Sequence, residues 1–270
     1  MKFWNDFGKK ELIIAHRGAR STRAENTMSA FEASLGRCDF IELDVGFTRD
    51  GVAIVIHDDT LERTTDIEQY SQYEAPYRVV DYSYEELQKL DFSSWFAQSD
   101  PFDTIKDGTL SLSELTSIPV QRVLRLVEVL HFCKEHQLPV NIELKDMRDT
   151  PLDSIIVTEV LSIIQELDIE SLVLISSFNH SYLKEFYSHA PEISLAALQK
   201  HNHPDNLIEY LNAIPVKSYH PRLNIINKSI ITELNSAGFL VNMFTVNDDG
   251  VKRRLFDDGV NAVFTDCLDG

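Results

Sequence analysis

Residues 139–178, PVNIELKDMRDTPLDSIIVTEVLSIIQELDIESLVLISSF, place one helical segment between two apolar runs. The runs 139–145 and 172–178 are short and rich in Val, Ile and Leu, as buried strands are. Residues 153–168 instead repeat apolar side chains at the spacing of an amphipathic helix. A strand, a helix and a second strand in this order predict two parallel strands joined by a helical crossover.

The same alternation extends along the chain in both directions. Eight apolar runs can be assigned as parallel strands: LIIAHRG (12–18), FIELDV (40–45), PVNIELK (139–145), LVLISSF (172–178), ISLAALQ (193–199), KSYHP (217–221), LVNMFTVN (240–247) and AVFTD (262–266). Helix-like segments separate most of them. Eight such units predict an α/β fold, a closed (β/α)8 TIM barrel, in a single domain of residues 1–270.

One further strand-like run, VAIVIHD (52–58), follows FIELDV after a few residues. That connection is too short for a parallel crossover, so the two runs should form an antiparallel hairpin with Asp50-Gly51 at its turn. With Arg49 and Asp50 as the two turn residues, His57 pairs with Glu42 to within one or two residues. The hairpin therefore returns His57 to the neighbourhood of FIELDV.

Residues from about 58 to 118 fit no barrel unit, and they are too many for an unstructured loop in a compact domain. We expect a small inserted subdomain over one mouth of the barrel. The helix-like segment 121–137 then rejoins the barrel.

Composition limits the partners and the compartment. The net charge of −18 argues against nucleic acid or an anionic membrane as a bulk partner. No apolar run approaches the roughly 18 residues of a transmembrane segment, and the N-terminal residues do not resemble a secretory signal. The three cysteines lie far apart and suggest neither a disulfide framework nor a zinc site, so we expect a cytoplasmic protein. The sequence does not indicate an oligomeric state.

Two carboxylates lie two residues apart in FIELDV. Glu42 and Asp44 share one face of that strand, and Leu43 and Val45 share the other. In a barrel the acidic pair faces the interior, where buried carboxylates repel each other and lose hydration. A divalent cation offsets both costs, and oxygen ligands favour Mg²⁺ or Ca²⁺ over zinc. The alternative is a solvated strand end, or salt bridges to nearby Arg or Lys.

Glu143 repeats this pattern on the predicted neighbouring strand, PVNIELK. A third inward carboxylate strengthens the metal hypothesis. Lys145 lies one step further along the same face and would reach toward the open end of the barrel. The competing interpretation is a structural ion pair between Lys145 and Glu143 or Glu42.

His16 and His57 each end an apolar run beside these carboxylates. A single histidine at a strand end is usually structural, but two around the same acidic pair could divide into a catalytic base and a catalytic acid. Arg17 offers a forked, permanently charged donor to a phosphate, and Gly18 allows a close backbone approach. His220, in SYHP, is interpreted as structural or peripheral.

The motifs taken together resemble those of glycerophosphodiester phosphodiesterases. The matching pieces in the first third of the chain are HRG (16–18), ENT (25–27) with Ala30-Phe31, IELDV (41–45), TRDG (48–51), HD (57–58) and LERTT (61–65). The later pieces follow in order as NIELK (141–145), SSF (176–178), YHP (219–221), FTVN (244–247) and GVNAVFTD (259–266). The resemblance covers nearly the whole chain outside residues 58–118.

The resemblance implies a (β/α) barrel, one divalent cation and hydrolysis of glycerophosphodiesters to sn-glycerol 3-phosphate and an alcohol. By motif, the resemblance implies that Glu42, Asp44 and Glu143 are metal ligands. It implies that His16 and His57 are the acid/base pair, and that Arg17 and Lys145 hold the phosphate. Phe244 stands where the family usually has Trp, so its contact with substrate could differ. Gln121 and Arg122 stand where a Thr-Leu-Glu-Glu run often opens the next helix.

Three alternatives remain at this stage. The first is a lysophospholipase D, which would keep the mechanism but act on lysolipids bound in an apolar groove of the insertion. Such a groove could be lined by Tyr70, Tyr73, Tyr77, Phe92, Trp95 and Phe96. The simpler interpretation is that these aromatic residues form the insertion's own core. A lyase could form a Schiff base at Lys145. The third alternative is a non-catalytic barrel that only binds phosphate. The presence of both histidines argues against this alternative.

Overall fold

The eight predicted parallel strands close into a barrel in the computed structural model, which describes residues 2–5, 7–8 and 10–268. The strands, in their order around the ring, are β1 (Leu12–Ala15), β9 (Ala262–Thr265), β8 (Leu240–Met243), β7 (Ser218–Pro221), β6 (Ser194–Gln199), β5 (Val173–Ser177), β4 (Val140–Leu144) and β2 (Phe40–Phe47). Pairing of Ile14 with Phe40 joins β2 back to β1 and completes the ring. The TIM-barrel prediction is confirmed.

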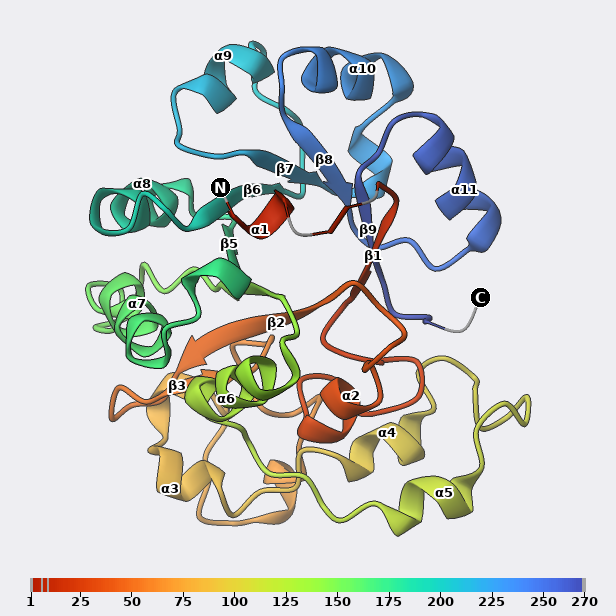
Figure 1. The fold of residues 1–270 in the computed structure, drawn as a ribbon. Helices are drawn as coiled ribbons and strands as arrows, with labels where there is room; N and C mark the ends of the chain where they lie inside the picture. The colour runs from red at the N-terminus through yellow and green to blue at the C-terminus, as the bar shows by residue number, and fades with distance from the viewer. Residues whose placement is uncertain (1, 6, 9, 269–270) are drawn as a thin grey trace.

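Helices surround the ring of strands (Figure 1). They are α2 (Met28–Glu32), α6 (Leu126–His136), α7 (Ile156–Leu167), α8 (His180–His189), α9 (Leu207–Asn212), α10 (Lys228–Ser236) and α11 (Asp249–Asp257), with the short 3₁₀ turns η3 (Glu170–Leu172) and η4 (Leu223–Ile225). Side-chain caps start α8, α10 and α11 at Asn179, Asn227 and Asp248. No helix in the described part of the chain is both long and apolar enough to cross a membrane.

The alternation along each strand separates two environments. In β2, Leu43 and Val45 join the apolar layer between the strands and the outer helices, whereas Glu42 and Asp44 lie on the opposite face of the strand. Both faces are buried. This is why the run FIELDV combines a continuous apolar pattern with two carboxylates.

A short N-terminal helix, α1 (Lys2–Asn5), packs against the end of the barrel where the strands begin. Phe3 is buried and contacts Phe40, the first residue of β2, with 5.2 Å between ring centroids. Trp4 and Phe7 join the same cluster inside the ring. Aromatic side chains therefore fill this end of the barrel, and Figure 1 shows α1 in front of the strands.

The hairpin is confirmed, but its register differs by one residue from the prediction. Strand β3 (Ala53–Val55) pairs antiparallel with β2, and Val45 faces Val55. The loop has three residues, because Thr48 faces Val52 through a 3.1 Å backbone hydrogen bond and Gly51 adopts a positive φ of 78°. The Thr48 hydroxyl also accepts from the Val52 amide at 3.0 Å, which fixes this longer turn.

The insertion lies on one side of the ring, next to β3, α2 and α6, and not over the mouth of the barrel (Figure 1). It contains η1 (Ile67–Gln69), η2 (Val79–Asp81), α3 (Tyr84–Leu87), α4 (Ser94–Ser99) and α5 (Leu112–Ser117). The predicted position was wrong because the insertion's apolar side chains join Ile54 and Ile56 in one cluster and Ala24 in another. All six aromatic residues considered for a lipid groove belong to these two clusters.

The helix after the insertion begins later than predicted. Gln121 and Arg122 precede it in a segment without regular secondary structure, and α6 starts at Leu126. Glu128 lies in its first turn and accepts a 2.8 Å hydrogen bond from the Arg125 amide. The carboxylate in the first turn of α6 is therefore that of Glu128, which lies after Gln121 and Arg122 in the chain.

Phe40→Ala should lower the free energy of unfolding by about 3–5 kcal/mol, because it removes a fully buried ring from the cluster that closes the barrel. Urea unfolding followed by circular dichroism measures this loss. Tyr187→Ala is the matched control, since that ring is 45% exposed and its removal should cost less than about 0.5 kcal/mol. Equal losses in the two variants would contradict the role given to Phe40.

Candidate active site

Three carboxylates meet at the carboxyl ends of β2 and β4. Asp44 and Glu143 are register partners on these adjacent parallel strands, and Glu42 lies one pleat below Asp44. Ligand oxygens of the three side chains all lie within 4.8 Å of one another, and the three residues are buried. The sequence prediction that they share one face of the barrel is confirmed.

The electrostatics of this triad favour a bound cation. Burial, together with the charges of Asp44 and Glu143, raises the pKa of Glu42 well above its ordinary value. Burial also acts to raise the pKa of Asp44, but the cationic groups of Arg17 and Lys145 outweigh it and hold that pKa below its usual range. Asp44 Oδ1 is buried without a hydrogen-bond partner among the described residues. An all-oxygen donor set with an orphaned oxygen fits a hard divalent cation.

Arg17 is bound to the triad through its backbone and its side chain. Its amide donates to Glu42 Oε2 at 2.8 Å, and its Nε lies 3.2 Å from Asp44 Oδ2. Its Nη1 donates to Glu25 at 2.9 Å. Nε forms no hydrogen bond but faces Asp44, whereas Nη2 has neither a hydrogen bond nor an ion pair among the described residues and is the nitrogen left to meet a ligand oxygen.

Gly18 allows this approach of the chain to β2. Its φ is +85°, and a Cβ at this position would lie 2.8 Å from the backbone carbon of Ala30. Any side chain would therefore push the segment after β1 away from α2.

Lys145 forms the ion pair that the sequence analysis considered, with a different second partner. Its Nζ lies 3.0 Å from Glu143 Oε1 and 3.6 Å from Asp44 Oδ1. Burial would lower the pKa of Lys145, but the two carboxylates outweigh this effect and raise that pKa above its ordinary value. Lys145 is thus a firmly protonated ammonium at the edge of the triad.

Each of the two histidines bonds a carboxylate through Nδ1. His16 Nδ1 lies 2.7 Å from Asp266 Oδ1, and His57 Nδ1 lies 2.5 Å from Asp58 Oδ1. A carboxylate at Nδ1 holds the ring so that Nε2 is the nitrogen left to exchange a proton with a ligand. Burial, followed by the charge of Arg17, lowers the pKa of His16.

A buried carboxylate that was assigned no role in the sequence analysis connects these two pairs. Glu25 accepts from Arg20 Nε at 2.8 Å and from Arg63 Nη2 at 2.6 Å. Arg20 also donates to Asp266 at 3.1 Å, and Arg63 donates to Asp58 at 2.5 Å. The network therefore runs from one histidine to the other through Glu25.

Sequence reasoning missed these supporting residues as functional candidates. Asp266, Asp58 and Glu25 belong to the motifs GVNAVFTD, HD and ENT, so their positions were visible. Asn26 also belongs to ENT and donates from Nδ2 to Asp44 Oδ2 at 3.0 Å. Their partners lie up to 250 residues away in the chain, which no local pattern reveals.

A cavity of about 890 Å³ opens beside the triad and is called the main cavity here. It is lined by His16, His57, Arg17, Lys145, Glu42, Glu143, Asn141, Phe178, Leu198, Gln199, Lys200, His201, Arg222, Leu223, Asn224, Phe244, Thr245 and Phe264. No residue between His57 and Asn141 lines it, so the insertion does not contribute. Phe244 forms an apolar wall with Phe178, with 6.0 Å between ring centroids.

His220 lies inside the barrel and does not line the main cavity. Its Nε2 bonds Asn242 at 2.9 Å, its side chain is fully buried, and burial lowers its pKa to about 3. A neutral, buried imidazole of this kind fits the structural interpretation.

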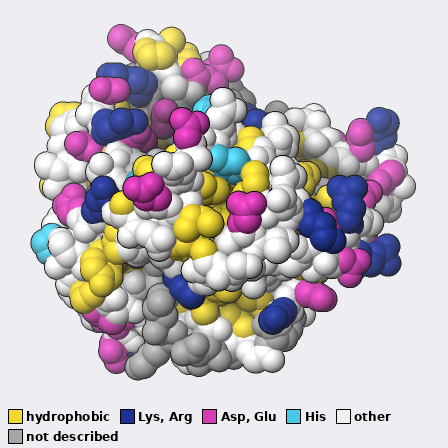
Figure 2. Space-filling model, turned by 90° about the horizontal axis from the view of Figure 1, so that it is seen from above, with side chains coloured by type: hydrophobic (Ala, Val, Ile, Leu, Met, Phe, Trp, Pro, Cys, Tyr) yellow, Lys and Arg dark blue, Asp and Glu magenta, His cyan; other side chains and the backbone are white. Residues whose placement is uncertain are grey.

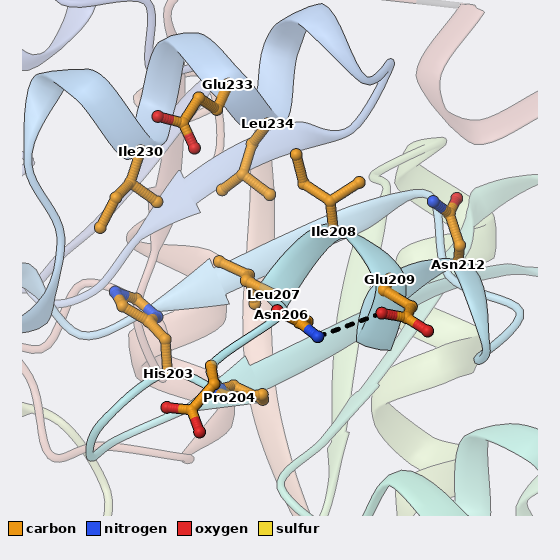
Figure 3. A pocket seen from close by; sticks show the side chains of 11 residues that line it. His203, Pro204, Asn206, Leu207, Ile208, Glu209, Asn212, Ile230, Glu233 and Leu234 are labelled. Atoms are coloured by element: carbon orange, nitrogen blue, oxygen red, sulfur yellow. Dashed lines mark hydrogen bonds between the residues drawn. The ribbon is translucent and has the colours of Figure 1, made fainter.

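A groove of about 800 Å³ lies outside the barrel, between α9 and α10. His203, Leu207, Ile230 and Leu234 contribute to its walls, as Figure 3 shows. Figure 2 looks onto this face of the molecule and shows hydrophobic and histidine side chains near its middle, with carboxylates around them. None of the predicted site residues lines this groove.

Comparison with known proteins gives a consistent result. Residues 16–269 match the glycerophosphoryl diester phosphodiesterase family. The chain is 35% identical to a glycerophosphodiester phosphodiesterase of Bacillus altitudinis over 95% of each chain. It is 31% identical to one of Caldanaerobacter subterraneus subsp. tengcongensis over 95% of this chain and 94% of that protein.

Solved structures share the fold. An Oleispira antarctica phosphodiesterase, in complex with the product sn-glycerol-3-phosphate, superposes with a TM-score of 0.78 at 24% identity, over 94% of this chain and 92% of that one. A glycerophosphodiester phosphodiesterase from Agrobacterium tumefaciens gives a TM-score of 0.70 at 23% identity, over 96% and 97% of the two chains.

Glu42→Gln should raise the stability of the protein in EDTA by about 1–3 kcal/mol at pH 7, because it removes a carboxyl group that can ionise only against burial and two neighbouring carboxylates. The gain should grow as pH rises above about 4.3, since the unfolded wild type ionises there while folded Glu42 resists ionisation. Thermal unfolding from pH 4 to 8 measures it.

The same variant should lose the stabilisation that Ca²⁺ or Mg²⁺ gives the wild type, which is about 2.7 kcal/mol at one hundred times the dissociation constant. Glu128→Gln is the control, because that carboxylate lies on α6. A Glu42→Gln protein that is less stable in EDTA, or equally stabilised by the cations, would contradict this interpretation.

Proposed function

The chain belongs to the glycerophosphoryl diester phosphodiesterase family and is a phosphodiesterase of that family, and from this premise we propose that it hydrolyses glycerophosphodiesters to sn-glycerol 3-phosphate and an alcohol by metal-dependent acid/base catalysis. The observation that carries the proposal is the pair of histidines, each held by a carboxylate, that border the same cavity as a metal-fitting triad. The expected location is the cytoplasm, in keeping with three cysteines that form no disulfide.

Glu42, Asp44 and Glu143 would hold one divalent cation, Mg²⁺ or Ca²⁺, because all of their donors are carboxylate oxygens. When bound, the cation supplies Lewis-acid stabilisation of the charge that develops on the phosphoryl oxygens. Arg17 and Lys145 border the same cavity and add permanent positive charge, with Arg17 Nη2 and the Lys145 ammonium available to a phosphate. Phe244 offers an apolar wall to the substrate.

His16 and His57 exchange the two protons of the reaction. One imidazole removes a proton from the nucleophile as the new P–O bond forms, and the other donates a proton to the alcohol oxygen as the old P–O bond breaks. The nucleophile is water, or the adjacent glycerol hydroxyl in a route through a cyclic phosphate that water then opens. Asp266 and Asp58 hold the rings in place throughout.

The structure argues against a Schiff base at Lys145. That chemistry needs a neutral amine, whereas the two carboxylates beside Lys145 raise its pKa. The aromatic groove that would favour lysolipids is also absent from the described insertion, because its rings pack into two small cores. Glycerophosphodiesters with small headgroups are therefore the preferred substrates.

A coupled assay of glycerol 3-phosphate release tests the proposal. The wild-type enzyme is assayed on several glycerophosphodiesters and on a lysolipid, in EDTA and after each metal is restored. Release that requires Mg²⁺ or Ca²⁺ is expected. Activity that persists in EDTA, or that appears with the lysolipid alone, would contradict the proposal.

His16→Ala and His57→Ala should each lower kcat by about 10²–10⁴-fold, because each removes one partner in proton transfer. Their affinity for Ca²⁺ or Mg²⁺, measured by calorimetry, should stay close to that of the wild type, since neither residue belongs to the carboxylate triad. His189→Ala, on the exposed side of α8, is the control. If the replacement of either histidine leaves kcat near the wild-type value, the role proposed for that histidine is wrong.

Asp266→Asn should lower kcat by about 10- to 100-fold through misplacement of His16. It also removes a negative charge that raises the pKa of His16, so the limb of the pH–rate profile that belongs to His16 should move to lower pH. Asp266→Glu should restore part of the rate. If Asp266→Asn lowers kcat but leaves this limb of the pH–rate profile unchanged, Asp266 contributes to folding and not to the pKa of His16.

A further inference from the structure

A second cavity, which we call the side cavity, lies next to the main cavity and has a volume of about 200 Å³. His57 and Lys145 line both cavities. A phosphodiester has two arms on one phosphorus atom, so a phosphate held between these two residues would extend one arm into each cavity.

The side cavity has an apolar floor and a charged rim. Buried side chains of Phe47 and Ile56, of Val79 in the insertion, and of Met147 after β4 contribute apolar surface. The rim carries Asp58, Asp59, Asp146, Asp149 and Arg78. The insertion therefore contributes to this second cavity and not to the main one.

The positive charges around the side cavity already have partners. Lys145 lies 3.0 Å from Glu143, and Arg78 lies 2.8 Å from Asp81, which does not line the cavity. Cationic groups of Arg63 and Arg148 likewise face two of the rim carboxylates, those of Asp58 and Asp146.

The remaining rim carboxylates are Asp59 and Asp149, of which Asp149 interacts only weakly with Arg148, the cation already paired with Asp146. Asp59 and Asp149 have no ion pair within 4 Å in the described part of the chain, and both are exposed at the entrance. The uncompensated charge at this cavity is therefore negative.

We propose that the side cavity holds the alcohol arm of the substrate, and that Asp59 and Asp149 make it select cationic alcohols of the choline and ethanolamine class. The apolar floor can accept the methylene or methyl groups of such an alcohol, and the rim carboxylates lie where its ammonium emerges. This inference rests on the proposed function and identifies its substrate class.

The test compares kcat/KM for glycerophosphocholine with kcat/KM for glycerophosphoglycerol, whose headgroup is neutral. The wild type should favour the cationic headgroup. Asp59→Asn and Asp149→Asn should each lower the ratio by about two- to fivefold, as expected for exposed charge pairs, and the double variant should lower it further. Raising the salt from 0.05 to 0.5 M should reduce the wild-type ratio in the same direction.

Asp205→Asn is the matched control, because it removes an equal charge from the groove between α9 and α10. It should leave the ratio unchanged. Thermal unfolding of every variant confirms that the protein is folded. A wild-type ratio near one, or a double variant that keeps the wild-type ratio, would overturn the assignment of the side cavity. Absence of glycerol 3-phosphate release from every substrate would instead overturn the proposed function.

Discussion

The structure of the site follows from the cost of placing three carboxylates within 4.8 Å of one another in a buried barrel end. Arg17 and Lys145 offset part of this cost, and the raised pKa of Glu42, caused by burial and by the charges of Asp44 and Glu143, favours the neutral form of that carboxyl group. A divalent cation held here would allow all three carboxylates to ionise and would make the site attract anions. Substrate binding would then be coupled to metal binding through electrostatics.

A second set of ion pairs holds the two histidines, His16 and His57, in place. Glu25 is buried and bonds three arginines, Arg17, Arg20 and Arg63. The last two each bond the carboxylate that holds one histidine, so the two imidazoles share one continuous network. A change in charge at Glu25 would therefore reach both histidines, although Glu25 lines neither cavity.

Much of this arrangement was predictable, because it follows from strand periodicity. The alternation in FIELDV and NIELK predicted which carboxylates face inward, and the short TRDG connection predicted that His57 returns to them. The position of the insertion and the aromatic plug at Phe3 were not predictable, since they depend on which distant apolar surfaces meet. The ion-pair network was missed for the same reason: Asp266 lies 250 residues from His16.

A chain with a strongly negative net charge can still bind an anionic substrate, because positive charge is concentrated around the main cavity. Arg17, Lys145, Lys200 and Arg222 line it, and the first two are paired with carboxylates while the last two are exposed at its mouth. A phosphate approaching the protein therefore meets uncompensated positive charge at the cavity and negative charge over the rest of the surface. Because exposed charges are screened within about 8 Å at physiological salt, the local sign governs the final approach and the net charge does not. The acidic composition excludes other polyanions from the surface without closing the site to a small phosphodiester.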